Sequence, residues 1–371
     1  MAHVMTKKTS RLSQQTAADH EMKPPRPHRT RRVMITSTIL AIAVLVAASV
    51  SAAIGQFEVS PIEVFGSINR VVFQGASPQD QQVDAALWTI RFPRMFLALF
   101  VGASLAVAGA VMQGVFANPL AEPSIVGVSS GASVGATLAI VSGTLSVSAW
   151  FLPLGAFIGA FIATVMVWSF ARMGGKTAVL TLVLTGIAIN ALAAAATSFL
   201  IFLGDASSRE QVIFWQLGTL SDARWQNVGV IAVIFVLAFT GCIFIRRQLD
   251  VLSLGDNSAA ATGVHVERLR GVAILLVCVL TGTAVAFSGV IAFVGLIVPH
   301  ALRLVLGPSH RFLIPLSALG GAVLLSLSDI AARTVVPFAD LPIGIFTAAV
   351  GGPLFLLLLR RTLQGQGGLG R

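Results

Sequence analysis

Long apolar stretches separated by short polar ones run along the chain from residue 33 to residue 359. The first stretch, 33–54, carries no charged residue and is long enough to cross a membrane once, which takes about 20 residues. It is too long for the apolar part of a secretion signal, which has about 7–15 residues. The pattern therefore predicts an all-α polytopic membrane protein, with further apolar stretches at 95–115, 124–145, 150–170, 178–203, 227–245, 271–302, 312–332 and 343–359.

One of these stretches, 271–302, is too long for a single span. As one helix it would measure about 48 Å, whereas the hydrocarbon core of a bilayer is about 30 Å thick. A turn near Gly289–Gly295 would let it cross twice, and 19 of the 25 Lys and Arg residues would then face the cytoplasm, against 15 for a single crossing. Because cytoplasmic loops are enriched in Lys and Arg, we predict ten transmembrane helices with both termini in the cytoplasm.

The overall composition agrees with a membrane protein. Hydrophobic residues make up 56% of the 371 residues and charged residues 11%, whereas soluble domains carry about 25% charged residues. The net charge of +10 does not indicate nucleic-acid binding, because 8 of the 25 Lys and Arg residues lie within residues 1–32 and most others flank apolar stretches. Residues 1–32 are polar and are predicted to form a disordered cytoplasmic tail.

Residues typical of catalysis or metal binding are sparse. Tyr is absent, and Cys242 and Cys278 lie in apolar stretches without the spacing of a metal site, so we predict neither a metal site nor a bound cofactor. The sequence GGKT at 174–177 lacks the first glycine of a phosphate-binding loop, since residue 170 is Phe. We therefore predict that the chain is not an enzyme and does not itself hydrolyse ATP.

Six polar or Gly/Pro-rich segments interrupt the apolar pattern. In order they read WTIRFPR (88–94), QGVFANPLAEPSIVGVSSGAS (113–133), SLGDNSAAATGV (253–264), GVIAFVGLIVPHALR (289–303), SDIAAR (328–333) and DLPIGIFTAAVGGP (340–353). With these segments in this order, the chain from residue 33 to 361 resembles the FecCD family. Members of that family are permease subunits of ABC importers for ferric siderophores, heme and vitamin B12.

The resemblance implies a type II ABC importer permease fold for residues 33–371, with a coupling loop at about 247–270. It implies a homodimer in the cytoplasmic (inner) membrane, driven by two cytoplasmic subunits that use ATP and Mg. A periplasmic or lipid-anchored binding protein would deliver the substrate. No cofactor bound by this chain and no nucleic acid is expected, and the lipid bilayer is its remaining partner.

Three arginines at predicted outer helix ends, Arg91, Arg94 and Arg333, run against the positive-inside trend. They can pair with outer acids of the same chain, such as Asp84, Asp329 or Asp340, or snorkel at the interface. They can also bind carboxylates of an acidic partner, because a guanidinium grips a carboxylate through two hydrogen bonds. The resemblance implies the second role, docking of the binding protein.

Two predicted cytoplasmic segments complete the expected machinery. Asn118-Pro119-Leu120 is a turn signal, and the resemblance implies that Asn118 and Leu120 help form the cytoplasmic gate. The segment 255–263 predicts a short helix that Asp256 or Asn257 caps and Gly263 ends. The resemblance implies that this helix couples the chain to the ATPases, with the residues concerned being Gly255, Asp256, Ala259 and Gly263.

The histidines and the cargo complete the predictions. His300 and His310 are expected to be structural, because both fall on the predicted cytoplasmic side and VPH is common to the family whether or not the substrate contains iron. Similarity in the last helix and in FWQLGTLSDARW (214–225) favours heme as cargo, followed by a ferric siderophore and then vitamin B12. An ion-driven secondary transporter is the rival class, although such proteins usually place ionisable residues inside their spans.

Overall fold

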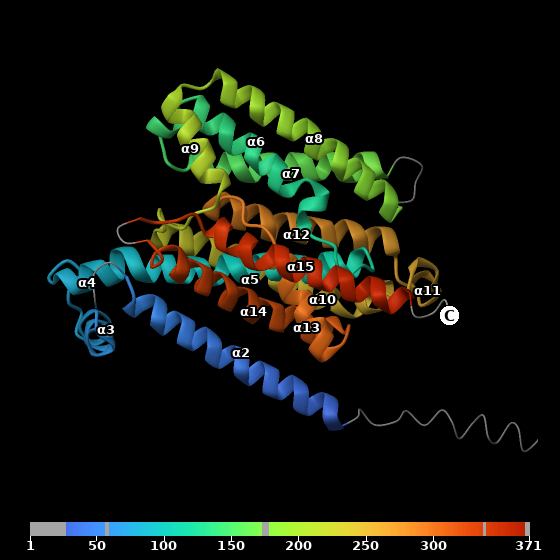
Figure 1. Ribbon diagram of the computed structural model, residues 1–371, viewed down its shortest axis with the longest axis horizontal. Helices are drawn as coiled ribbons and strands as arrows, with labels where there is room; N and C mark the ends of the chain where they lie inside the picture. The colour runs from blue at the N-terminus through green and yellow to red at the C-terminus, as the bar shows by residue number, and fades with distance from the viewer. Residues whose placement is uncertain (1–26, 56–58, 173–177, 337–338, 368–371) are drawn as a thin grey trace, which may run out of the picture.

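The computed structural model describes residues 27–55, 59–172, 178–336 and 339–367, and every regular element in these ranges is a helix. Most of them run roughly parallel or antiparallel to one another, as Figure 1 shows. In chain order the elements are α2 (Pro27–Ala53), α3 (Pro61–Ile68), η1 (Asn69–Phe73), α4 (Gln82–Ala86), η2 (Leu87–Arg91), α5 (Phe92–Val115), η3 (Pro123–Val126), α6 (Val128–Val141), η4 (Thr144–Ser146), α7 (Phe151–Ala171), α8 (Val179–Leu203), α9 (Ala206–Gln216), α10 (Trp225–Leu252), α11 (Asp256–Ala261), α12 (Val266–Ser288), α13 (Val294–Leu306), α14 (His310–Ala332) and α15 (Ile343–Gly367).

The helices match the predicted spans. Seven helical stretches in the described part of the chain are long and apolar enough to cross a membrane, and α6, α13 and the first part of α15 are shorter apolar helices. The break predicted within 271–302 is confirmed, because α12 ends at Ser288 and α13 begins at Val294. Gly289 and Phe293 bound this break with φ values of +68° and +69°, a left-handed conformation that ends the helix.

The first helix begins earlier than the apolar stretch does. α2 starts at Pro27, so residues 27–32, which the sequence assigns to a disordered tail, are helical. Residues 1–26, the rest of that tail, lie outside the described residues. Proline at a helix start and a run of arginines are compatible with a helix that extends beyond the apolar core of a membrane.

Helix α5 is the centre of the bundle. It is almost wholly buried, and α10, α12, α13 and α14 pack around it. Its approach to α14 and α13 depends on glycine pairs, because a Cβ atom on Gly102 would collide with the backbone of Gly321 and one on Gly109 with that of Gly295. Close backbone contact of this kind holds helices together in lipid, where no hydrophobic force acts between them.

Helices α6 to α9 form a second group on one side of α5 and α12 (Figure 1). Gly155 and Gly159 of α7, which are four residues apart, lie against Gly135 and Gly131 of α6, so these glycines let the two helices pack closely. On the opposite side, α2 covers α14 and keeps most of its own surface exposed. The helices α3, α4 and α9 lie at one end of the bundle and α11 at the other, as the ten-span topology requires.

Candidate functional site: an arginine cluster, a gate turn and a coupling loop

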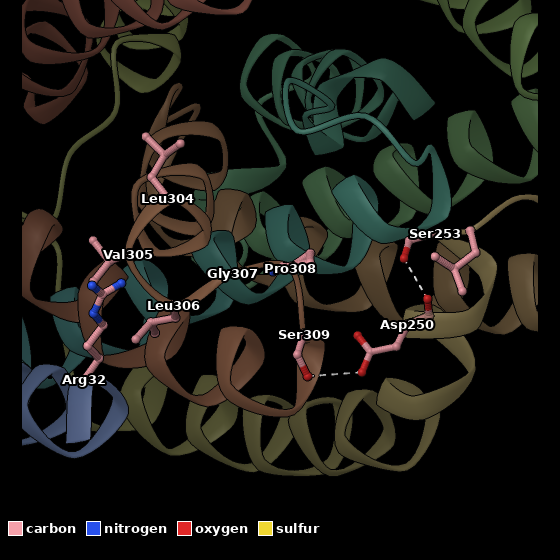
Figure 2. A pocket seen from close by; sticks show the side chains of 10 residues that line it. Arg32, Asp250, Ser253, Leu304, Val305, Leu306, Gly307, Pro308 and Ser309 are labelled. Atoms are coloured by element: carbon pink, nitrogen blue, oxygen red, sulfur yellow. Dashed lines mark hydrogen bonds between the residues drawn. The ribbon is translucent and has the colours of Figure 1, made fainter. Parts of the chain in front are cut away.

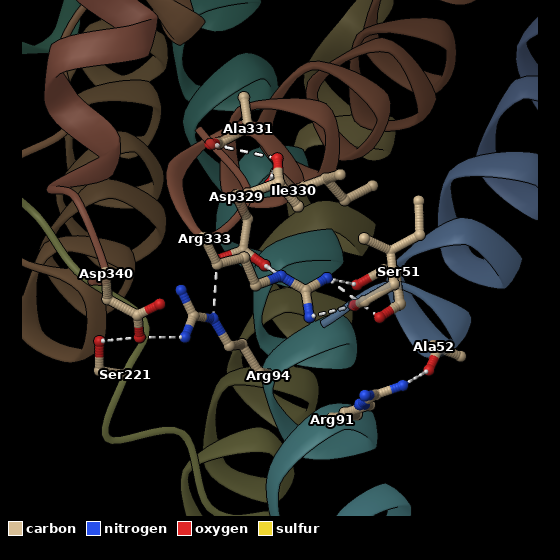
Figure 3. Close-up of polar contacts among 12 residues, drawn as sticks. Ser51, Ala52, Arg91, Arg94, Ser221, Asp329, Ile330, Ala331, Arg333 and Asp340 are labelled. Carbon is tan, nitrogen blue, oxygen red and sulfur yellow. Dashed lines mark hydrogen bonds and ion pairs between the residues drawn. The ribbon is translucent and has the colours of Figure 1, made fainter. Parts of the chain in front are cut away.

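The three predicted arginines come together at the end of the bundle opposite α11 (Figure 3). Arg91 is the last residue of the π-helical segment η2, and Arg94 lies in the first turn of α5. Arg333 follows the last residue of α14. All three are buried, with 6%, 6% and 8% of their surface exposed.

Arg94 holds two carboxylates from distant parts of the chain. Its Nε donates to Oδ1 of Asp329 at 2.8 Å, and its Nη1 donates to Oδ2 of Asp340 at 2.7 Å. Asp329 is fully buried on α14, whereas the side chain of Asp340 keeps 35% of its surface exposed. Arg94 therefore ties the start of α5 to the end of α14 and to the segment before α15.

Arg333 and Arg91 fasten α2 to the same cluster. Arg333 lies 3.3 Å from Asp329 through its Nε and donates from Nη2 to the hydroxyl (2.7 Å) and the carbonyl (3.0 Å) of Ser51. Arg91 donates from Nη1 to the carbonyl of Ala52 at 2.7 Å. Pairing within the chain is thus observed for Asp329 and Asp340, whereas Asp84, the third acid considered, pairs with Arg70 instead at 2.6 Å.

Asn118 and Leu120 lie in a tight turn directly after α5. The Asn118 Oδ1 atom accepts from the backbone N–H of Leu120 at 2.9 Å, and Asn118 N–H donates to the carbonyl of Gln113 at 3.2 Å. Asparagine closes turns of this kind because its side chain mimics a backbone carbonyl. Leu120 is half-buried, so part of its side chain is open to contact from outside the chain.

Helix α13 holds this turn from two sides. His300 Nδ1 lies 3.3 Å from the carbonyl of Pro119, and the N–H of Phe293 donates to Glu122 Oε1 at 3.2 Å. Glu122 thereby satisfies a free N–H at the start of α13, where negative charge is favoured. Glu122 was not among the predicted functional residues, although an acid within the NPLAEP segment, next to long uncharged stretches, was the available signal.

The coupling segment is a short helix, as predicted, but its cap is different. The N-terminal cap of α11 is Gly255, with φ +106° and no side-chain cap, so the prediction that Asp256 or Asn257 caps the helix is wrong. A carboxylate at Asp256 instead accepts two hydrogen bonds from Arg270 of α12, at 2.7 and 3.0 Å. This stronger, charge-assisted contact outcompetes capping.

The end of α11 agrees with the prediction. Gly263 has φ +83°, and the N–H of Val264 returns to the carbonyl of Ala259 at 3.1 Å. Ala259 is fully buried against Leu252 and Leu269, whereas Asp256 is exposed. The small helix is therefore fastened to α10 and α12 while one side of it stays uncovered.

Asp250, near the end of α10, connects this region to α14 (Figure 2). Its Oδ1 accepts from the backbone N–H of His310 at 2.6 Å and lies 2.7 Å from His310 Nδ1, while Ser309 Oγ donates to Oδ2 at 3.3 Å. The buried His310 ring lies against Gly114, where a Cβ atom would come within 2.5 Å of Nε2. His310 thus occupies the space between the coupling region and the last turn of α5. An open cavity of about 820 Å³ adjoins these residues.

In the described part of the chain, ten apolar helices, a glycine-packed central helix and a short surface helix between α10 and α12 are the features of a polytopic helical membrane protein. Comparison with protein families matches residues 33–361 to the FecCD transport family, and the chain belongs to that family. It is a permease subunit of an ABC importer, a transport component and not an enzyme, and such permeases act with ATP-binding subunits and a substrate-binding protein.

Individual relatives cover most of the chain. The cobalamin import system permease protein BtuC of Halobacterium salinarum is 44% identical over 283 residues, 76% of this chain and 75% of its own. The hemin transport system permease protein HmuU of Yersinia pestis is 41% identical over 297 residues, 76% of this chain and 86% of its own. Among solved structures, a metal-chelate type ABC transporter in an inward-facing conformation superposes with a TM-score of 0.76 at 32% identity, covering 88% of this chain and 99% of that one.

Proposed function

We propose that two copies of this chain form the pathway of an inner-membrane importer that moves a large metal complex, with heme as the first candidate. The observation that carries the proposal is the connection of the coupling region to the gate turn. Asp250 contacts His310, His310 packs on Gly114, and Gly114 directly precedes the turn that contains Asn118 and Leu120. Movement imposed on the α10–α12 loop by ATP-driven partners would reach the gate through these contacts.

The cargo proposal rests on similarity. One of the two relatives described above is named for hemin and the other for cobalamin, which are both metal-bearing tetrapyrroles. Cobalamin therefore stands beside heme as an alternative, and a ferric siderophore is the third. Heme is placed first because the segment that begins with Asp340 and the outer segment 214–225 look slightly more like those of heme permeases.

A deletion strain tests the cargo. Cells lacking this chain are grown under iron limitation with heme or a ferric siderophore as the iron source, and separately with a cobalamin requirement. Loss of growth on heme alone supports the heme assignment. Loss of growth only on cobalamin, or only on a siderophore, would assign that compound as the cargo. Uptake that persists without ATPase activity but stops when an ionophore is added would favour an ion-driven transporter.

We also propose that the arginine cluster docks the binding protein by exchanging carboxylates. Arg94 and Arg333 already hold acids of their own chain, and the partly exposed Asp340 is the one most readily displaced. An incoming glutamate or aspartate could take its place on Arg94 without leaving a buried charge unpaired, which would be costly.

Removing the internal competitor tests this exchange. If Asp340 competes with the partner, Asp340→Asn should strengthen binding-protein association several-fold, while Arg94→Gln should weaken it. The affinity of the binding protein for each variant is measured with the permease held in nanodiscs that are immobilised on a sensor surface. Weaker binding in both variants would mean that the cluster only maintains the structure, and Arg70→Gln serves as the control because Arg70 pairs with Asp84 at the same end.

A further inference from the structure

A row of large apolar side chains on α3 and η1 faces away from the protein. Ile62, Phe65 and Phe73 keep 84%, 75% and 78% of their surface exposed, and Val72 keeps 55%. Because three to four residues make one helical turn, these positions share one side of the segment. No acidic or basic residue occupies those positions, and the segment lies outside the long apolar helices.

The opposite side of the segment is firmly attached. Val64 and Ile68 pack on a small core that includes Leu87 and Phe92. The start of α3 is set by a capping box in which Ser60 and Glu63 exchange hydrogen bonds, and these donors hold the pKa of the Glu63 carboxyl below its usual range. The exposed row therefore belongs to a fixed helix and not to a loose loop.

Tryptophans place the segment at the depth of a membrane surface. Trp88 Nε1 donates to Ser67 Oγ of α3 at 3.1 Å, and Trp225 Nε1, at the first residue of α10, donates to the carbonyl of Trp88 at 2.7 Å. Tryptophan gathers where apolar chains of the lipid meet the headgroups. Since Ser67 of α3 accepts a hydrogen bond from Trp88, and Trp88 in turn accepts one from Trp225, α3 lies at the depth of these tryptophans.

The direction of α3 fits that position. In Figure 1 α3 is seen end-on, whereas α2 and α14 lie along the picture, so α3 runs across the spans. It follows α2, which exposes Ile39, Ile42 and Leu45 along its length. The apolar row of α3 thus lies next to the exposed apolar surface of a membrane-spanning helix and runs across it, as a helix in the plane of the bilayer surface would.

We propose that α3 and η1 form an interfacial anchor whose exposed apolar side chains insert into the outer leaflet of the membrane. An amphipathic helix of this kind buries its apolar side about 5–10 Å into the boundary between headgroups and acyl chains. The anchor fixes the end of α2 next to the carbonyls that Arg91 and Arg333 hold. It does not depend on the cargo or on docking of the binding protein.

Site-directed fluorescence tests the anchor. The Phe65→Cys variant is labelled with an environment-sensitive dye and reconstituted into phosphatidylcholine–phosphatidylglycerol vesicles that carry nitroxide lipids labelled at the headgroup or along the acyl chain. The control is Gln79→Cys, an exposed residue in the polar stretch that follows η1. The native Cys242 and Cys278 are buried, and the unmodified chain measures any labelling they contribute.

The proposal expects blue-shifted emission at position 65 and quenching several-fold stronger than at position 79, most of all by nitroxide close below the headgroups. Phe73→Cys should give the same result and guards against a local effect of one substitution. Water-like emission with no quenching at both apolar positions would overturn the anchor. So would a blue shift that appears only when binding protein is added, which would assign the surface to a protein partner.

Discussion

At the scale of single residues, the packing of the protein depends on glycines, which have no side chain to keep neighbouring helices apart. Gly109 and Gly295 let α5 and α13 touch backbone to backbone, and Gly102 and Gly321 do the same for α5 and α14. A Cβ atom added at any of these positions would meet the backbone of the facing helix first, and a backbone cannot move aside as a flexible side chain can. These glycines therefore mark the positions at which two helices touch.

Gly109→Ala should destabilise the protein by about 1–3 kcal/mol, because its Cβ would collide with the Gly295 carbonyl and force the helices apart. Gly229→Ala is the matched control, since nothing lies within 4 Å of a Cβ there. That control should be neutral or stabilising by up to about 1 kcal/mol, as alanine favours helix. Thermal unfolding in detergent compares the two, and equal unfolding temperatures would contradict the packing argument.

At the scale of elements, the break between α12 and α13 creates a helix start inside the bundle. Glu122, from the segment that follows the gate turn, accepts the Phe293 N–H at this start, and His300 of the same helix contacts Pro119. The gate turn and α13 are therefore fastened together at two points. They should move as one body when the pathway opens.

Glu122→Ala should loosen this connection and let cargo leak through without ATP. Glu122→Gln keeps an oxygen that can accept the Phe293 N–H and should behave like the natural chain. The measurement is ATP-independent release of cargo trapped in proteoliposomes. Identical leakage from the two variants would show that the Glu122 contact does not restrain the gate.

At the scale of the whole molecule, the two ends of the bundle hold different clusters of polar contacts. The end with Arg91, Arg94 and Arg333 joins α2, α5, α14 and the segment before α15, while the other end holds α11 and the contact of Asp250 with His310. Helix α5 spans the distance between them, with Arg94 in its first turn and Gly114 in its last. Each end can therefore influence the other through one rigid helix.

Asp250→Ala should lower the amount of cargo moved per ATP several-fold, because His310 loses its partner and the link between the coupling region and α5 weakens. ATP hydrolysis by the partner subunits should persist, so the ratio of the two rates is the quantity to measure. Asp80→Ala, at an exposed turn of the opposite end, is the control. A fall in both rates by the same factor would point to lost assembly and not to lost coupling.

Patterns within the sequence were sufficient to predict a polytopic membrane protein, most of its helices and the break in 271–302. These properties follow from local hydropathy, helix length and turn residues, which act over a few neighbouring positions. Local rules failed where a distant group intervened: Asp256 looks like a helix cap in the sequence, yet Arg270 takes its carboxylate. Polarity alone was also insufficient at residues 27–32, where a helix forms in a segment that the sequence assigns to a disordered tail.

Which charged side chains pair with one another depends on the packing of the helices in three dimensions. Arg94 binds acids 235 and 246 positions further along the chain, and Glu122 reaches a backbone N–H 171 positions away. In the sequence, Asp84, Asp329 and Asp340 were equal candidates for pairing with the three arginines. In the structure Asp84 pairs with Arg70, whereas Asp329 and Asp340 pair with Arg94. The physical reason is that buried charges must be paired, and which partner is within reach depends on how the helices pack and not on their order along the chain.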